Sequence, residues 1–149
     1  MRLQKKLAFL LVMLIAVACT DAQLTKLSKA LDDTAIAMGQ LQTMVIAANK
    51  QNLIPDSDTE SIIRLCYKIN DASQRASTVT RNLTKLTAPA SSSVLAILQP
   101  VIQGVQDALS TGTLGIKDGP TKSAVTAALV AIQTGLNTAQ VVLAATGGK

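Results

Sequence analysis

The sequence predicts an all-α protein, an antiparallel four-helix bundle preceded by a cleaved signal peptide. Beyond residue 20, apolar residues recur at spacings of three and four, which places them on one face of a helix, and no stretch alternates as a strand does. Short segments with Pro, Gly or Ser separate four such stripes and favour antiparallel neighbours. One Phe, one Tyr and no Trp leave a core of small aliphatic residues, so we expect closely approaching helices. The expected domain covers residues 24–145, with a disordered tail at 146–149.

The N-terminus has the composition of a secretory signal peptide, which we place at residues 1–18. Arg2, Lys5 and Lys6 precede an uninterrupted apolar run at 7–18. A helix rising about 1.5 Å per residue would not span roughly 30 Å of hydrocarbon over that length. We therefore expect removal of the segment, which lowers the formal net charge from +5 to +2. An uncleaved anchor or a buried N-terminal helix is the alternative.

The end of this run, Ile-Ala-Val-Ala-Cys at residues 15–19, resembles the lipobox of bacterial lipoproteins. The resemblance covers residues 1–19 only. It implies that Ala18 is the last residue of the signal peptide, that Cys19 carries diacylglycerol and usually an amide-linked acyl chain such as palmitate, and that residues 19–23 form a short tether. Two or three acyl chains anchor a protein stably where one chain does not.

Two residues close to Cys19 in the sequence affect how we expect the signal peptide to be cleaved and where we expect the protein to be located. Ala16 stands where the lipoprotein class most often has Leu, so ordinary signal-peptide cleavage after Ala18 or Ala22 is the alternative. Thr20 resembles the residue after the cysteine of lipoproteins that are sorted to the outer membrane. We therefore expect a lipid-anchored protein of the cell envelope, on the periplasmic face of the outer membrane rather than at the inner membrane. The alternative is a soluble secreted or periplasmic protein.

The two cysteines, Cys19 and Cys66, offer a second alternative. A signal peptide implies an oxidising compartment, in which the two would form a disulfide if Cys19 were not lipidated. Cys66 lies among apolar positions of a helical segment and has no activating neighbour. We expect it to be a free, buried cysteine that packs as a small hydrophobe.

The first helix is expected at residues 24–52. Its apolar residues follow the a and d positions of nearly four heptads. They are Leu24, Leu27, Leu31, Thr34, Met38, Leu41, Val45 and Ala48.

The second helix is expected at residues 57–87, after a break at 52–55. Ser57 and Glu60 have the spacing of a capping box, in which each side chain bonds the other residue's backbone N–H. Glu60–Arg64 and Asp71–Arg75 are i, i+4 pairs on the outer face. This interspersion of acids with bases indicates a solvated surface and argues against nucleic-acid binding. The apolar stripe contains Ile62, Leu65, Ile69, Ala72, Ala76, Val79, Leu83 and Leu86.

The third and fourth helices are expected at residues 92–110 and 120–145. Pro89 should end the second helix, and the serines at 91–93 should cap the third. Pro100 predicts a kink or a restart of the helix. A loop at 111–119 precedes Pro120, which suits a first helical turn. The inward residues are Val94, Leu98, Val101, Val105 and Ala108, then Val125, Leu129, Ile132, Leu136, Ala139 and Leu143.

The sequence offers little chemistry. It has no His and one Glu, which excludes Ser-His-Asp triads, His-ligated zinc and carboxylate–His metal sites of the helical-bundle type. No phosphate-binding, dinucleotide-binding or nucleophile-elbow motif occurs. We expect a protein that is not an enzyme, with no catalytic residues, no metal and no cofactor.

Amide side chains form polar stripes at i, i+4, i+7 on the last two helices. Almost no charge accompanies them, so this half is a candidate docking face for a partner subunit, another lipoprotein domain or the membrane surface, unless the amides merely solvate the surface. A transmembrane hairpin is disfavoured, because each amide would need an internal partner. The stripes are Gln99, Gln103 and Gln106, and Gln133, Asn137 and Gln140.

The function that the sequence favours is that of a non-enzymatic envelope lipoprotein whose helical bundle is a scaffold or binding module at the membrane. One alternative is a carrier of an apolar ligand, with Met38 and Met44 beside an adjustable cavity. Another is a membrane-active toxin, lysis or exclusion factor, in which the charge-poor third and fourth helices insert.

Overall fold

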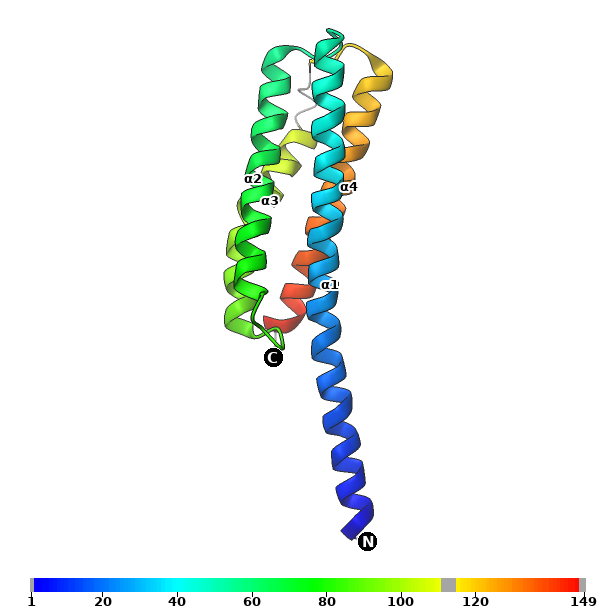
Figure 1. The fold of residues 1–149 in the computed structure, drawn as a ribbon, viewed down its shortest axis with the longest axis vertical. Coiled ribbons are helices and arrows are strands. Elements are labelled where there is room, and N and C mark those ends of the chain that lie inside the picture. The colour runs from blue at the N-terminus through cyan, green and yellow to red at the C-terminus, as the bar shows by residue number, and fades with distance from the viewer. Residues whose placement is uncertain (1, 111–114, 148–149) are drawn as a thin grey trace.

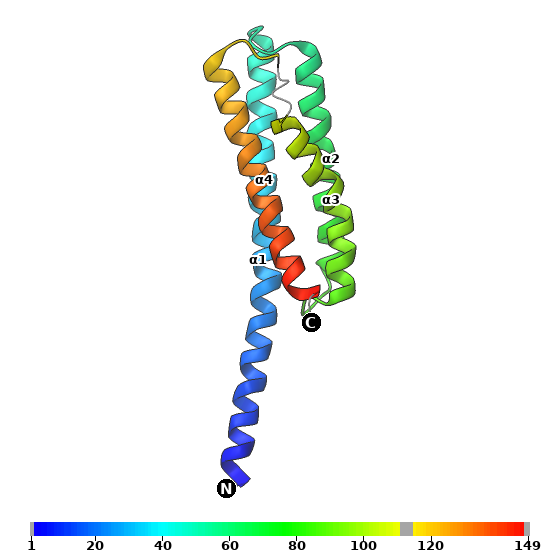
Figure 2. The same ribbon diagram turned by 180° about the vertical axis from the view of Figure 1, so that it is seen from behind.

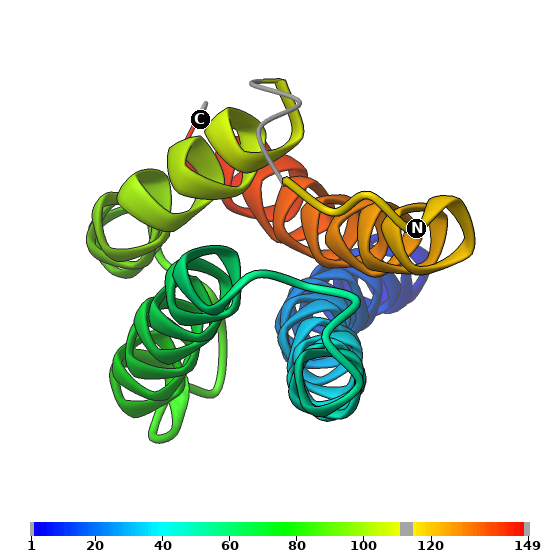
Figure 3. The same cartoon turned by 90° about the horizontal axis from the view of Figure 1, so that it is seen from above.

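The computed structural model describes residues 2–110 and 115–147, with side chains at 22–110 and 115–146. It contains four helices in an up-and-down bundle, and the described residues contain no strand (Figure 1). The order around the bundle is α1, α2, α3, α4, and contacts join each helix to its two neighbours (Figure 3). The helices are α1 (Arg2–Lys50), α2 (Asp56–Thr80), α3 (Ala88–Ser110) and α4 (Gly119–Gly147). The predicted all-α fold is therefore confirmed.

Helix α1 begins at Arg2, far before the expected residue 24, and its N-terminal portion projects past the other three helices (Figure 1). The apolar run at 7–18 is rich in Leu and Ala, which are strong helix formers, so it continues the same helix. The C-terminal end of α4 and the 81–87 connection lie at the end of the bundle from which this portion projects (Figure 2). The helix ends at Lys50, because Asn52 adopts the left-handed conformation at φ 58° and Leu53 N–H bonds the Ala48 carbonyl at 2.9 Å.

The predicted limits of α2 are wrong at both ends. The helix starts after Pro55, with backbone N–H groups of positions 58 and 59 bonding the Pro55 carbonyl, and no side chain caps it. The capping box does not form, because the Glu60 carboxylate binds Arg64 instead. At the other end the helix stops at Thr80, before a stretch of Asn and Thr, which are weaker helix formers. Leu86 is nevertheless buried, so the connection supplies a residue that we placed on the helix.

Helix α3 begins four residues earlier than expected, at Ala88. Thr87 caps it, since its carbonyl accepts from Ser91 N–H at 2.8 Å and its hydroxyl accepts from Ala90 N–H at 3.4 Å. Pro89 lies in the first turn, where its missing N–H costs no helical hydrogen bond. Ser91 is not a cap but a buried residue of the helix. The helix continues through Pro100 without a restart, and its ribbon changes direction partway along (Figure 2).

Helix α4 begins at Gly119 and ends at Gly147. Asp118 caps it, because its carboxylate accepts from Thr121 N–H at 2.8 Å and its carbonyl accepts from Lys122 N–H at 2.9 Å. Pro120 lies in the first turn, as we expected. The helix includes positions 146 and 147, which we assigned to the tail, and the rest of that tail lies outside the described residues. Of the expected 111–119 loop, residues 115–118 are described and are not helical.

The core contains nearly all the apolar residues that the spacing placed there, including the whole predicted stripe of α4. On α2 the stripe is shifted, since Cys66 is fully buried and Leu65 only half-buried. Helices α1 and α4 form the most extensive contact of the bundle. Gly135 provides their close approach, because a Cβ at that position would collide with the Thr34 hydroxyl. The expected close packing of small residues is therefore present between the first and last helices.

Candidate functional site

The six amide residues proposed as a docking face, which we call the amide surface, are surface residues. The three on α3 and Asn137 are exposed, whereas Gln133 and Gln140 are half-buried. Leu65 of α2 packs against Gly104 on one flank of α3, and α1 packs against Gly135 on one flank of α4. At 100° per residue, the amides lie on the other flanks of these two helices. The two stripes therefore border the α3–α4 contact from both sides and form one surface.

The amide surface carries almost no charge. Between positions 88 and 146 the ionisable residues are Asp107, Lys117, Asp118 and Lys122, and only Asp107 lies beside the amides. Its carboxylate accepts a hydrogen bond from Gln103 Nε2 at 2.8 Å. Val130 and Val141 are exposed near the amides of α4, by 48% and 69%. Such a surface loses less hydration energy on contact than a charged one.

Helices α3 and α4 are also long and apolar enough to cross a membrane. Ala88–Ser110 and Gly119–Thr146 contain windows of mean hydropathy 1.2 and 1.4, and a third of each window is buried inside the bundle. Length and composition alone give weak evidence, because core helices of soluble bundles have the same properties. In this structure the three leucines and Ile132 of α4 are core residues, whereas Val130 and Val141 are exposed.

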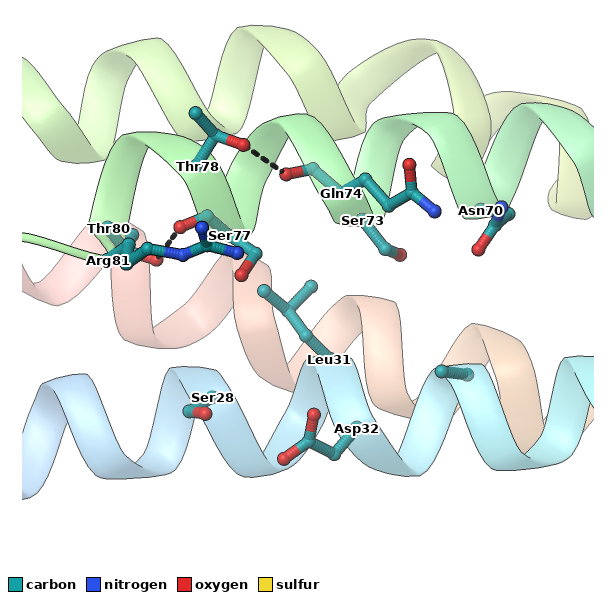
Figure 4. Close-up of a pocket in the computed structure, with 11 residues that line it drawn as sticks. Ser28, Leu31, Asp32, Asn70, Ser73, Gln74, Ser77, Thr78, Thr80 and Arg81 are labelled. Atoms are coloured by element: carbon teal, nitrogen blue, oxygen red, sulfur yellow. Dashed lines mark hydrogen bonds between the residues drawn. The ribbon is translucent and has the colours of Figure 1, made fainter.

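A polar groove of about 450 Å³ lies between α1 and α2 (Figure 4). These two helices lie on the side of the bundle opposite α3 and α4, which carry the amide surface (Figure 3). We call it the α1–α2 groove. Helix α1 contributes Ser28, Leu31, Asp32 and Ala35. The wall formed by α2 and the residue after it contains Asn70, Ser73, Gln74, Ser77, Thr78, Thr80 and Arg81. The two helices make the least extensive contact among the four neighbouring pairs, which is consistent with small side chains on both walls.

The groove contains hydrogen-bonding groups that the protein leaves unused. The Ser73 hydroxyl oxygen is buried and has no partner among the described residues. Asp32 and Arg81 stand on opposite walls, and neither takes part in the ion pairs of the described residues. Those ion pairs, including Lys29–Asp33 at 3.1 Å, each join residues of a single helix. Asp58 Oδ2, Thr59 Oγ1 and Ser91 Oγ are likewise buried without a partner among the described residues, so this state is not particular to the groove.

We did not predict the groove from the sequence, although a signal is present. Between Asn70 and Arg81, small or polar residues recur at spacings of three and four on one flank of α2. From the sequence we considered only the charged pairs Glu60–Arg64 and Asp71–Arg75 of the outer face and made no prediction for this flank. Recognising a groove also requires the facing residues Ser28 and Ala35 of α1, and that pairing depends on how the helices pack.

A second groove, between α2 and α3, is apolar. It has a volume of about 550 Å³ and includes Leu65, Ile97, Val101 and Gly104. This groove is not the apolar-ligand cavity that we expected beside Met38 and Met44, because neither residue lines it. Met38 is buried in the core, and Met44 is half-buried against it.

Cys66 is a free cysteine in the core, as we expected, so the alternative disulfide is not formed in this structure. Burial raises the pKa of its thiol to about 11. Cys19, the expected site of lipid attachment, lies outside the residues whose side chains are described. Within the described part of the chain, no three His, Cys, Asp or Glu side chains cluster as metal ligands would.

Comparison with known proteins assigns no family, because no protein family, curated protein or solved structure matches the chain. The features of the molecule that bear on its function are therefore the amide surface, the α1–α2 groove and the N-terminal portion of α1.

Proposed function

We propose that the protein is a non-enzymatic binding module of the cell envelope, tethered to the membrane through its N-terminus, that docks a protein partner or a second copy on the amide surface. The observation that carries the proposal is the arrangement of six uncharged amides on one face of α3 and α4. Amide groups lose less hydration energy on contact than charged groups do, and they supply donors and acceptors that fix the orientation of a partner.

The tether in this proposal is a lipid on Cys19, which places the protein on the periplasmic face of the outer membrane. The path of α1 supports it, since the helix runs from the N-terminal segment directly into the bundle (Figure 1). The amide surface then lies along the side of the bundle rather than at the end nearest the membrane. A partner would approach it laterally.

Placing positive charges on the amide surface tests the docking. Gln103→Lys with Asn137→Lys should preserve the helical circular dichroism, because both side chains are exposed. It should abolish self-association in sedimentation velocity or capture of cross-linked partners in cells, because two buried, unpaired ammonium groups oppose an interface. The matched control is Gln40→Lys with Gln51→Lys, at exposed glutamines elsewhere, which should change neither. Identical behaviour of the docking variant and wild type would contradict the proposal.

Mass spectrometry of protein extracted from membranes tests the tether. The expected species begins at Cys19 and carries added acyl mass. Cys19→Ser should leave an unprocessed chain without lipid. An unmodified amino terminus at Cys19 or Gln23 in the native protein would refute the lipid anchor without affecting the docking experiment.

Insertion of α3 and α4 into a membrane is a second candidate function, favoured by the length and hydropathy of both helices. It requires these helices to leave the bundle and to place their amides in hydrocarbon, which is costly. Dye release from liposomes by the wild-type protein would support insertion. Intact liposomes together with partner capture would support docking.

A further inference from the structure

The outward face of α4 carries a second repeat of seven residues. At 100° per residue, this face lies opposite the stripe that α4 buries in the core, which contains Leu129, Leu136 and Leu143. Its residues alternate at spacings of three and four, as the a and d positions of a coiled coil do. They are Ala127, Val130, Thr134, Asn137, Val141 and Ala144, which we call the α4 seam. All six are exposed, so the described part of the chain leaves this heptad pattern uncovered.

The α4 seam is more apolar than its composition suggests. Val130 and Val141 are exposed by 48% and 69%. The Thr134 hydroxyl donates to the Val130 carbonyl at 2.8 Å, so it is bonded within its own helix and its methyl group is available for packing. Asn137 is the one amide of the seam, and its burial in a contact requires a partner for both its donor and its acceptor.

The residues beside the seam allow two identical copies to meet. In a coiled coil the flanking e and g positions select the partner, because charges there attract or repel the facing helix. On α4 these positions are uncharged, and positions 123–146 contain no ionisable residue. Pairing of the seam with itself therefore brings no like charges together, and a charged partner would find no complementary charge. The flanking residues are Thr126, Ala131, Gln133, Thr138 and Gln140.

Asn137 favours one direction of pairing. In a parallel pair each seam residue meets its own copy, so the two Asn137 amides bond each other, donor to acceptor. In an antiparallel pair, Asn137 meets Thr134 of the other copy, whose hydroxyl already donates to its own helix and leaves the Asn137 carbonyl oxygen without a donor. Parallel pairing also leaves both α1 helices projecting from the same end, toward one membrane (Figure 2).

We propose that the α4 seam joins two copies of the protein in a parallel dimer with two-fold symmetry. The inference rests on the docking function proposed above, since it names a second copy as the partner and α4 as the helix that contacts it. Asn137 fixes the register of the pair, as a single polar residue does in the core of a coiled coil.

Cross-linking of introduced cysteines tests the dimer in membranes of cells that express the full chain. Val130→Cys and Val141→Cys, each oxidised with copper phenanthroline, should give a disulfide-linked dimer, because a parallel pair places each position against its own copy. Wild type measures the background from Cys19 and Cys66. Ile36→Cys is the matched control, at a residue of α1 that is 61% exposed, and should stay near that background.

A second substitution tests the chemistry of the contact. Val141→Lys should reduce cross-linking of Val130→Cys about tenfold, because two unpaired ammonium groups would face each other. Ile36→Lys in the same chain should leave cross-linking unchanged. Both lysine variants should keep the helical circular dichroism, since both residues are exposed.

The dimer and the docking function can fail separately. Absence of cross-links at both seam positions would overturn the dimer. Docking of another partner would stand if Gln103→Lys with Asn137→Lys still abolished capture of that partner. Gln103→Lys alone should leave the cross-links unchanged, because Gln103 lies on α3, outside the seam.

Other results would also overturn the dimer. Equal cross-linking of Val130→Cys and Ile36→Cys would indicate random collision. Cross-links that form only when Val130→Cys and Val141→Cys chains are expressed together would indicate an antiparallel pair. A cross-linked species that differs in mass from a dimer would assign the seam to another protein. Without cross-links, a blue shift of a fluorophore on Val141→Cys in liposomes would assign the seam to lipid.

Discussion

Gly135 of α4 lies so close to Thr34 of α1 that no side chain fits between the two helices. The Thr34 hydroxyl is fully buried and donates to the Ala30 carbonyl at 2.8 Å, which fixes its orientation. A Cβ on Gly135 would collide with that hydroxyl and would stand 3.1 Å from the Ala30 carbonyl oxygen. The separation of the first and last helices is therefore set by a glycine and a threonine that is bonded to its own helix.

Gly135→Ala should consequently destabilise the protein, although Ala forms helices better than Gly. Overpacking at a close helix contact costs about 1–3 kcal/mol. Gly39→Ala is the matched control, because its added methyl group would have no described atom within 4 Å other than the adjacent backbone of its own helix. It should stabilise the fold by about 1 kcal/mol through helix propensity alone. Urea denaturation of both variants measures the difference, and equal stabilisation would show that α1 and α4 are further apart than the structure places them.

Ile69→Asp tests the burial of the α2 stripe. Ile69 is 1% exposed, so the substitution places an unpaired carboxylate in the core at a cost of several kcal/mol, comparable with the stability of a small domain. Arg75→Asp, at a side chain that is 64% exposed, should change the thermal midpoint little. Circular dichroism melting curves compare the two variants. Similar melting curves would mean that the face of α2 that contains Ile69 is not the face buried in the core.

The Cys66 thiol should make stability fall with rising pH. Its pKa is about 11 in the folded state and 9.0 when unperturbed, so above pH 9 the unfolded chain loses the proton that the folded chain retains. The stabilisation is complete below pH 9 and lost as the pH rises toward 11, about 2–3 kcal/mol in all. Urea unfolding of wild type and Cys66→Ala at pH 8 and pH 11 isolates this contribution. A pH dependence that is unchanged in Cys66→Ala would contradict it.

Asp118 should have the opposite pH dependence. Hydrogen bonds from the Thr121 side chain and backbone lower the pKa of its carboxyl group below 3.8. Its stabilisation is present above that value and is lost as the pH falls through the folded-state pKa. Asp118→Asn should keep the cap and lose this acid sensitivity, and Asp118→Ala should lower the melting temperature at every pH. Melting curves between pH 6 and pH 2 distinguish the three proteins.

The sequence allowed the core to be predicted more accurately than the helix ends. Burial of a helix face requires a repeat near 3.6 residues, so Leu129, Leu136 and Leu143 were placed correctly from spacing alone. Helix ends depend on competition among nearby caps. Thr87 caps α3 although three serines follow it, and the Glu60 carboxylate binds Arg64 rather than closing a capping box.

For a related reason, the sequence predicts one of the two candidate surfaces and not the other. The amide stripes belong to single helices, so periodicity within α3 and α4 located them. The α1–α2 groove arises where Ser28 and Ser77, from two helices, come to face each other across a loose contact. The residue pattern of one helix does not specify how closely a second helix packs against it.

The dominance of the α1–α4 contact has a consequence for the order in which the molecule assembles. The chain emerges with its N-terminus first, yet the helix that covers most of the apolar stripe of α1 is the last to appear. Until α4 arrives, α1 exposes residues such as Leu27 and Leu41 that are buried in the finished fold. Loss of α4 would leave α1 without its main cover, so we expect chains that stop near residue 118 to aggregate or to be degraded rather than persist as three-helix bundles.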